Sequence, residues 1–342
     1  MISFYDHLIT MGAITLVRSL LCVFGIIGNV ITIKVFLDIG VKNGVTASFL
    51  FLSCADLAYL VSVLVHSVAY GLHLYEEQTS YRTWFAVKPF AVFVYFANVA
   101  SCPYMVTVLT TMFLSVVRCL GVSQPLRFRS SITRTNALWV LFAFLVLAVG
   151  SSVPLLAFMG IVTQFDERIN MSRPSLWVSP LRQWVKDVTF VVRDAILPLV
   201  TELVLSVCVV VMATSLRSAS KFRSLHASES SNIPEQTSSY DPKNETRSRS
   251  SRLKVGSTHL RGRDLQVVQQ MLLLSAACLI CHTPKITYNC VKLFLPDISD
   301  VLLANGIRDF FQSINCSVTF LIYNKFNSKF HKRVAFKALV HT

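Results

Sequence analysis

Seven apolar segments, each long enough to cross a lipid bilayer, constrain the fold of this chain more than any other feature. A membrane-spanning helix needs about 20 apolar residues, and a membrane β-barrel would instead show alternation of polar and apolar residues, which is absent here. The sequence therefore predicts an all-α membrane protein, a bundle of seven transmembrane helices. The predicted spans lie near 13–37, 46–70, 88–119, 136–159, 188–215, 265–292 and 304–323.

The composition supports a membrane protein and argues against nucleic-acid binding. Hydrophobic residues make up 53% of the chain and charged residues only 15%, whereas a soluble domain carries about a quarter charged residues. The net charge of +14 comes from basic residues that flank the apolar segments, so we expect the lipid surface as their partner. The nine cysteines lack metal-ligand spacing and lie mostly in apolar segments, so neither a disulfide framework nor a metal site is expected.

Lysine and arginine collect in the connections on one side of the predicted membrane. The connections 120–135 and 216–264 and the tail beyond 323 carry most of them. Because such residues remain in the cytoplasm, the N-terminus is expected outside and the C-terminus inside, with the plasma membrane as the location.

The predicted domain organisation follows from this topology. Residues 1–12 form a short extracellular N-terminus without a cleavable signal, and 13–323 form the membrane domain. The connection 216–264 is rich in Ser, Arg and Lys and is predicted to be a disordered cytoplasmic loop. In the tail 324–342, apolar residues at Phe326, Phe330 and Val334 predict a short amphipathic helix on the membrane surface.

Each predicted span contains one or two residues that lipid would disfavour. Taken singly, such a residue is explained by a polar contact between helices, and a terminal arginine by extension toward the interface. Their order along the chain is more informative than any one of them. They are Asn29, Asp56, Arg118, Trp139, Pro198, His282, Pro284, Asn315 and Tyr323.

That order resembles the rhodopsin-like G-protein-coupled receptors over the whole transmembrane part. The matching stretches are GNVITI, SCADLAYL, SVVRCLGVSQPLRF, CHTP and NCSVTFLIY. The resemblance implies a receptor without enzymatic activity that binds an extracellular peptide or small molecule. It also implies activation of a heterotrimeric G protein by outward movement of the sixth helix, with arrestin and receptor kinases as further partners. The stretch VRCLGVSQPL looks most like invertebrate peptide receptors and mollusc-type chemosensory receptors.

The resemblance also assigns roles to residues inside the bundle. Asp56, with Thr107 and Asn315, stands at the positions of an allosteric sodium site, and sodium is the one cofactor expected. Without an ion, a buried carboxylate would tend to protonate.

Arg118 stands at the position that holds the cytoplasmic ends of the helices together. Its usual acidic neighbour is replaced by Val117, which leaves Asp264 as the available partner. His282, Pro284 and Tyr323 complete the expected switch.

The sequence departs from the family in three places. The cysteines of the usual outer disulfide are missing, since Phe93 stands at one position and 155–197 contains none. We therefore expect packing of Trp177, Pro180 and Trp184 to hold the outer loop. His282 replaces the usual tryptophan of the sixth helix. Thr319-Phe320 replaces the usual Asn-Pro pair, and without that proline the seventh helix is expected to be straighter.

A ligand pocket is expected between the third, fifth, sixth and seventh helices. Lys285 is an intramembrane charge, with Asp309 or Asp194 as its expected partner. Ala100 replaces the aspartate of amine receptors, so a ligand with both carboxylate and amine groups, such as a peptide terminus or amino-acid-like odorant, fits better than a biogenic amine. The candidate ligand residues are His66, Tyr104, Asp194, Lys285, Asn289, Asp309 and Gln312.

Two alternatives come from other classes of protein. A transporter would show an inverted repeat with interrupted helices in both halves, and a membrane enzyme would need catalytic side chains at one depth. Neither pattern is present, because Asp56, Glu202 and His282 are scattered. Asn170-Met171-Ser172 in the outer loop is a glycosylation sequon.

Overall fold

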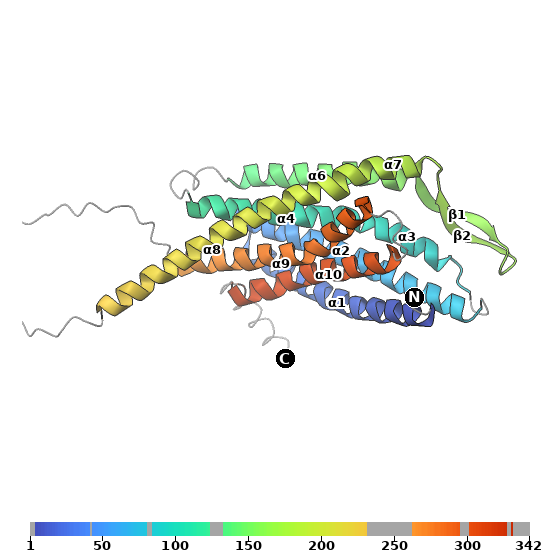
Figure 1. The fold of residues 1–342 in the computed structure, drawn as a ribbon, viewed down its shortest axis with the longest axis horizontal. Coiled ribbons are helices and arrows are strands. Elements are labelled where there is room, and N and C mark those ends of the chain that lie inside the picture. Colours follow the sequence, from blue (N-terminus) through green and yellow to red (C-terminus); the bar gives the residue numbers. More distant parts are fainter. Residues whose placement is uncertain are drawn as a thin grey trace, which may run out of the picture.

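A computed structural model shows long helices that lie side by side along one axis, with a β-hairpin at one end (Figure 1). It describes residues 4–41, 43–80, 84–123, 133–230, 262–294, 301–326 and 330, without side chains at 4–8, 219–230, 262–265, 290–294 and 301–304. The elements in order are α1 (Phe4–Ile39), α2 (Gly44–Gln78), α3 (Pro89–Val99), α4 (Ser101–Ser123), α6 (Arg134–Ala157), β1 (Met159–Asp166), β2 (Met171–Val178), α7 (Arg182–Thr189), the π-helix η1 (Phe190–Ile196), α8 (Leu197–Ser230), α9 (Gly262–Phe294) and α10 (Val301–Phe326).

Within the described part of the chain, six helices are long and apolar enough to cross a membrane, and they match the first six predicted spans. The prediction of an all-α membrane protein is confirmed at this level. The helix α10 covers the seventh predicted segment and packs against α1, α2 and α9, but it does not belong to those six. The six are Ile9–Ile39, Gly44–Gln78, Pro89–Ser123, Arg134–Ala157, Arg182–Ser218 and Gln266–Asn289.

Prolines explain the two changes of helical geometry near the hairpin. The helix assignment breaks at Ala100, between α3 and α4. Because Pro103 has no N–H, the carbonyl of Val99 loses its usual donor four residues later. The π-helix η1 likewise comes directly before Pro198, which removes the α-helical donor for the carbonyl of Asp194.

Two glycines allow α1 and α10 to pack closely. A Cβ atom at Gly25 would lie 2.3 Å from Ser317 Oγ, and one at Gly28 would lie 2.9 Å from Phe320 Cβ. On the same pair of helices, Asn29 Nδ2 donates to the carbonyl of Cys316 at 3.0 Å. The helix α10 is continuous through residues 319 and 320, in line with the expectation from the missing proline.

The bundle end away from the hairpin has an apolar, aromatic core. The ring of Tyr323 packs edge-on against Phe36 and Phe49, with centroids at 5.5 and 5.0 Å, and Phe330 lies beside it. Met212 of α8 and Met271 of α9 are fully buried in the same cluster. Apolar packing therefore joins α1, α2, α8, α9 and α10 at this end.

The prediction of a disordered loop was wrong for residues 216–230, because α8 continues to Ser230. This stretch contains neither proline nor glycine before Pro234, so the helix meets no breaking residue. Residues 231–261 lie outside the described part of the chain. The predicted tail helix also lies largely outside it, since only 324–326 and 330 of 324–342 are described.

The hairpin of β1 and β2 was not predicted. Its strands pair from Met159 with Val178 to Asp166 with Met171. The turn has chemistry that the sequence does show. Asp166 Oδ1 accepts the N–H of Arg168, and Asn170 has a φ of 52°, which asparagine tolerates better than most residues.

Ion pairs, and not tryptophan packing, hold this hairpin against the bundle. The predicted role of Trp177 and Trp184 was wrong, because these side chains are 42% and 70% exposed. Arg173 of β2 is 2% exposed and donates to Glu76 of α2 and to Asp166 of β1. This buried arginine links the hairpin to the end of α2.

The ion pairs shift the pKa values of both hairpin partners. Burial alone would raise the pKa of Asp166, but hydrogen bonds from Arg173 and the Arg168 backbone, with the charge of Lys88, lower it. Burial alone would lower the pKa of Arg173, but hydrogen bonds to Glu76 and Asp166 raise it. Both pKa shifts favour the charged forms, so the contact between Arg173 and Asp166 is an ion pair at neutral pH.

Candidate ligand pocket and polar core

A cavity of about 390 Å³ lies in the half of the bundle near the hairpin. Its walls come from α2, α3, α4, α6, α7, η1, α8, α9 and α10, and its size is in the range of small-ligand sites. All seven residues that the sequence put forward as ligand contacts line it. These are His66, Tyr104, Asp194, Lys285, Asn289, Asp309 and Gln312.

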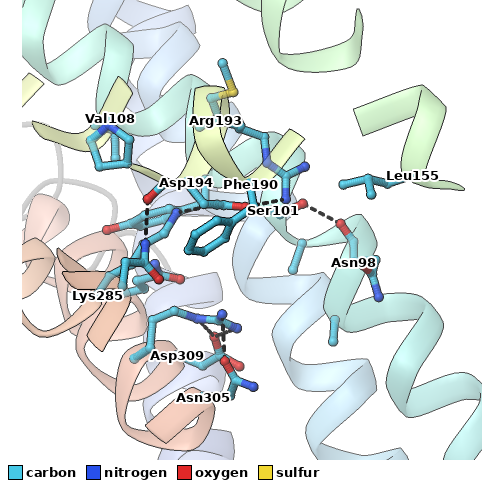
Figure 2. A pocket seen from close by; sticks show the side chains of 18 of the residues that line it. Asn98, Ser101, Val108, Leu155, Phe190, Arg193, Asp194, Lys285, Asn305 and Asp309 are labelled. Carbon is cyan, nitrogen blue, oxygen red and sulfur yellow. Dashed lines mark hydrogen bonds and ion pairs between the residues drawn. The ribbon is translucent and has the colours of Figure 1, made fainter. Parts of the chain in front are cut away.

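One side of the pocket is built around Asp194 of η1. Lys285 Nζ lies 3.1 Å from Asp194 Oδ1, and Arg193 Nη2 lies 3.4 Å from Oδ2, as Figure 2 shows. The side chain of Asn289 donates to the Asp194 carbonyl at 2.5 Å, which supplies a donor where Pro198 removed one. Of the two partners expected for Lys285, the structure pairs it with Asp194.

The other acidic residue of the pocket, Asp309, is surrounded by bases. Arg308 Nη2 lies 2.7 Å from Asp309 Oδ1, and Arg18 Nη1 and His66 Nε2 lie 3.6 and 3.5 Å from Oδ2. Arg18 comes from the middle of α1, and its Nε also donates to a serine of α2. Asp309 therefore connects α1, α2 and α10.

The pocket floor combines aromatic rings and one further acidic residue. The ring of Tyr104 packs against Tyr59 and His282, with centroids at 5.1 and 6.0 Å. His282 Nδ1 lies 3.3 Å from Glu202 Oε2, across the α8–α9 contact. The sequence offered no account of Glu202, and the structure gives it His282 as a partner. The hydroxyl of Tyr59 in turn donates to Gln312 at 3.1 Å.

Below the pocket, Asp56 is fully buried in the centre of the bundle. Thr107 Oγ1 of α4 donates to its Oδ1 at 2.7 Å, and Asn315 of α10 is also buried. The second oxygen, Oδ2, has no hydrogen-bond partner among the described residues, although Cys316 and Thr319 of α10 lie near the carboxyl group. A buried carboxylate oxygen without a partner, beside the hydroxyl of Thr107, fits a small cation such as sodium.

The residues of the expected switch lie at different depths: His282 lines the pocket and Pro284 follows it closely on α9, whereas Arg118 and Tyr323 lie farther from the hairpin. Arg118 is half-buried near the end of α4, and the side chain of its expected partner Asp264 lies outside the described residues. Pro284 lies inside α9, and the hydroxyl of Tyr323 is fully buried. The structure also shows a contact between α4 and α9 that was not predicted from the sequence. It is a hydrogen bond of 2.5 Å between the hydroxyls of Ser115 and Ser275.

Several bases around the pocket were missed by sequence reasoning. They lie within or beside apolar helices, where an ionisable residue generally faces the bundle interior, and this signal could have found them. Two of them directly precede a predicted acidic residue in the sequence. The missed bases are Arg18, Arg182, Lys186, Arg193 and Arg308.

Two further sequence predictions concern the surface. Trp139 is 66% exposed on α6, and its ring lies edge-on to Phe142 of the same helix. Asn170 is exposed at the hairpin turn, where its side chain is accessible. Its glycosylation stays a prediction.

Comparison with known proteins adds no family to this geometry. No family model matches the chain, and no curated protein is significantly similar to it.

Proposed function

We propose that this chain is a divergent rhodopsin-like receptor that binds an extracellular ligand in the pocket and activates a heterotrimeric G protein. The observation that carries the proposal is the convergence of the seven predicted ligand residues on one cavity. Helices that are far apart in sequence supply them, and an accidental scatter of polar residues would not produce this arrangement. The hairpin and the N-terminus then face outward.

The contacts below the pocket supply a route for the signal. The floor residue His282 lies on α9 next to Thr283 and Pro284, and it is tied to Glu202 of α8. Farther along the same helix, Ser275 is hydrogen-bonded to Ser115 of α4. A ligand that alters the contacts of His282 would therefore bias the position of α9 against α4, and outward movement of α9 would expose Arg118 to the G protein.

Sodium at Asp56 would stabilise the resting arrangement. Asp56, Thr107 and Asn315 would hold the ion, whose charge would balance the buried carboxylate. We expect sodium chloride to raise the melting temperature of the purified protein above that in choline chloride of equal ionic strength. Asp56→Asn should remove this difference, and a wild-type protein that melts equally in both salts would contradict a sodium site.

The receptor proposal is tested by G-protein coupling in cells. Basal and stimulated coupling are measured for the wild type and Arg118→Ala, at equal surface levels, with pools of peptides and small odorants. A pool that stimulates the wild type but not the variant would support the proposal. If both proteins reach the surface and neither signals with any pool, the receptor function is wrong, and uptake assays would test transport.

A further inference from the structure

The pocket carries more positive charge than its own acidic residues can balance. Five bases and two carboxylates line it, which leaves a formal excess of three positive charges with both histidines neutral. Lys186 is exposed to solvent, whereas the other four bases are half-buried and still outnumber the two carboxylates. Burying charge that lacks a partner is unfavourable, so such a pocket favours an anionic occupant. The five bases are Arg182, Lys186, Arg193, Lys285 and Arg308.

Neither carboxylate of the pocket is available to a ligand amine. Asp194 already contacts Lys285 and Arg193, and Asp309 contacts three basic side chains. Glu202 is held by His282 outside the lining of the cavity. The sequence-based expectation of a ligand with both acidic and amine groups is therefore half supported, since the described lining offers surplus cations and no surplus anion.

Two arginines that line the pocket each have one buried donor without a partner among the described residues. Arg193 Nη1 and Arg182 Nε are buried, and no described residue accepts a hydrogen bond from either atom. Arg182 makes its one hydrogen bond to an oxygen acceptor with Asn98, at 3.1 Å, and Arg193 contacts Asp194 only through Nη2. Buried donors of this kind are normally satisfied, so an acceptor that is absent from the protein itself is indicated.

The helical segment after the hairpin places these groups together. Arg182, Lys186 and Arg193 are separated by four and then seven residues along α7 and η1, and all three line the cavity. Such spacing puts side chains on one face of a helix. Figure 2 shows Arg193 beside Asp194 at the cavity, with Asn98 on the neighbouring helix.

We propose that the ligand presents an anionic group, a carboxylate or a phosphate, to Arg182 and Arg193. This inference rests on the proposed function and names the chemical class of its ligand. The planar guanidinium groups each offer two parallel N–H donors, which match the paired oxygens of these anions. The pairs Lys285–Asp194 and Arg308–Asp309 remain in place and shape the rest of the cavity.

Three matched sets of probes test the proposal on the purified full chain. The first is a set of N-acetylated tripeptides with free C-terminal carboxylates, and the second contains the same sequences with amidated C-termini. The third contains short alkyl phosphates. The melting temperature is measured at millimolar probe, and affinities are determined for the probes that raise it. The variants are Arg182→Gln and Arg193→Gln, and Arg134→Gln is a control with the same charge change outside the pocket.

We expect at least one anionic set to stabilise the wild type and the amidated set to have no effect. Each pocket variant should weaken binding about tenfold or more, because a charge-assisted hydrogen bond is lost, whereas the control should bind like the wild type. Response to carboxylates, phosphates or both identifies the source of the anion. Arg193→Lys keeps the positive charge but loses the paired N–H donors of the guanidinium group, so this variant should bind with intermediate affinity.

Three results would overturn the inference. They are equal stabilisation by amidated and free-acid peptides, no stabilisation by either anionic set, and unchanged binding in both pocket variants. The coupling assay separates this failure from failure of the receptor proposal. A neutral or cationic ligand that stimulates coupling would show that the anion-site inference is wrong while the receptor proposal holds. Anion binding without coupling under any condition would support the anion site and contradict the receptor proposal.

Discussion

The two ends of the bundle are held together by different forces. Near the hairpin, ion pairs such as Arg173–Glu76, Lys285–Asp194 and Arg308–Asp309 connect elements that are distant in sequence or shape the pocket. At the opposite end, the helices are connected by aromatic rings around Tyr323 and by the hydroxyl pair Ser115–Ser275. Buried ionic contacts are specific and strongly dependent on their partners, whereas apolar packing tolerates sliding.

This difference matches the division of work in the proposed receptor. An ionic end with surplus positive charge can bind an anion selectively, because wrong partners leave charges unpaired. At the other end, α4 and α9 are connected by apolar packing and by the neutral hydrogen bond Ser115–Ser275. Loss of that hydrogen bond leaves no unpaired charge, so these helices can separate at a smaller energetic cost than a buried ion pair would require. The following experiments test whether the two ends differ as described.

The largest effect is expected from Arg173→Met at the hairpin. The substitution removes the ion-pair partner of the buried Glu76 and leaves Asp166 with Lys88 alone, which should lower the free energy of unfolding by about 3–5 kcal/mol. Thermal melting of the purified protein measures this. Arg168→Met, on the exposed turn of the same hairpin, should change stability by less than about 0.5 kcal/mol. A melting temperature of Arg173→Met equal to that of the wild type would show that the ion pairs of Arg173 do not stabilise the fold.

The same ion pairs should respond to acid. Because the folded-state pKa of Asp166 is lowered, its contribution is complete above the unfolded pKa of about 3.9 and is lost as the pH falls through the folded value. Melting temperatures between pH 7 and 3 should show a drop in the acid range that is smaller in Asp166→Asn. Parallel profiles for the two proteins would show that this carboxylate does not contribute.

A double-mutant cycle measures the ion pair inside the pocket. Asp194→Asn, Lys285→Met and the double variant should give a coupling energy of about 0.5–3 kcal/mol in stability, since the side chains are 22% and 16% exposed and 3.1 Å apart. The same cycle on the exposed pair Gln183 and Asp187 serves as a control and should give a smaller coupling energy. Additive effects at positions 194 and 285 would mean that this contact does not hold the pocket.

The smallest stability effect is expected at the opposite end. Ser275→Ala removes the hydrogen bond to Ser115 and should cost about 0.5–1.5 kcal/mol. Basal G-protein coupling should nevertheless rise, because α9 loses a restraint against α4. Thr214→Ala, an exposed hydroxyl on α8 bonded only to its own helix, should change neither quantity. Lower basal coupling in Ser275→Ala would contradict a restraining role.

The sequence predicted the helices and the pocket better than it predicted the partners. Long apolar segments determine where helices form, and ionisable residues such as Lys285 and Asp309 must face the interior, so their convergence could be predicted. The contacts Arg173–Glu76 and His282–Glu202 join residues separated by 97 and 80 positions, and only the tertiary arrangement brings them together.

The hairpin was missed for a different physical reason. Its first strand buries only Met159 and Asp166, its two ends, so the strand lacks the apolar alternation that marks a strand packed on a core. The hairpin is stabilised by a buried arginine, Arg173. The sequence alone does not show whether an arginine is buried or exposed.

The distance between α4 and α9 at the end away from the hairpin tests the central claim most directly. Spin labels attached by a cysteine-independent chemistry at the exposed positions Leu120 and Gln266 would report it in lipid nanodiscs. We predict a longer distance when the protein binds its anionic ligand and a G protein, and a partial lengthening in Ser275→Ala alone. A distribution that stays the same with ligand, with G protein and with both would contradict the proposal that binding near the hairpin separates these helices.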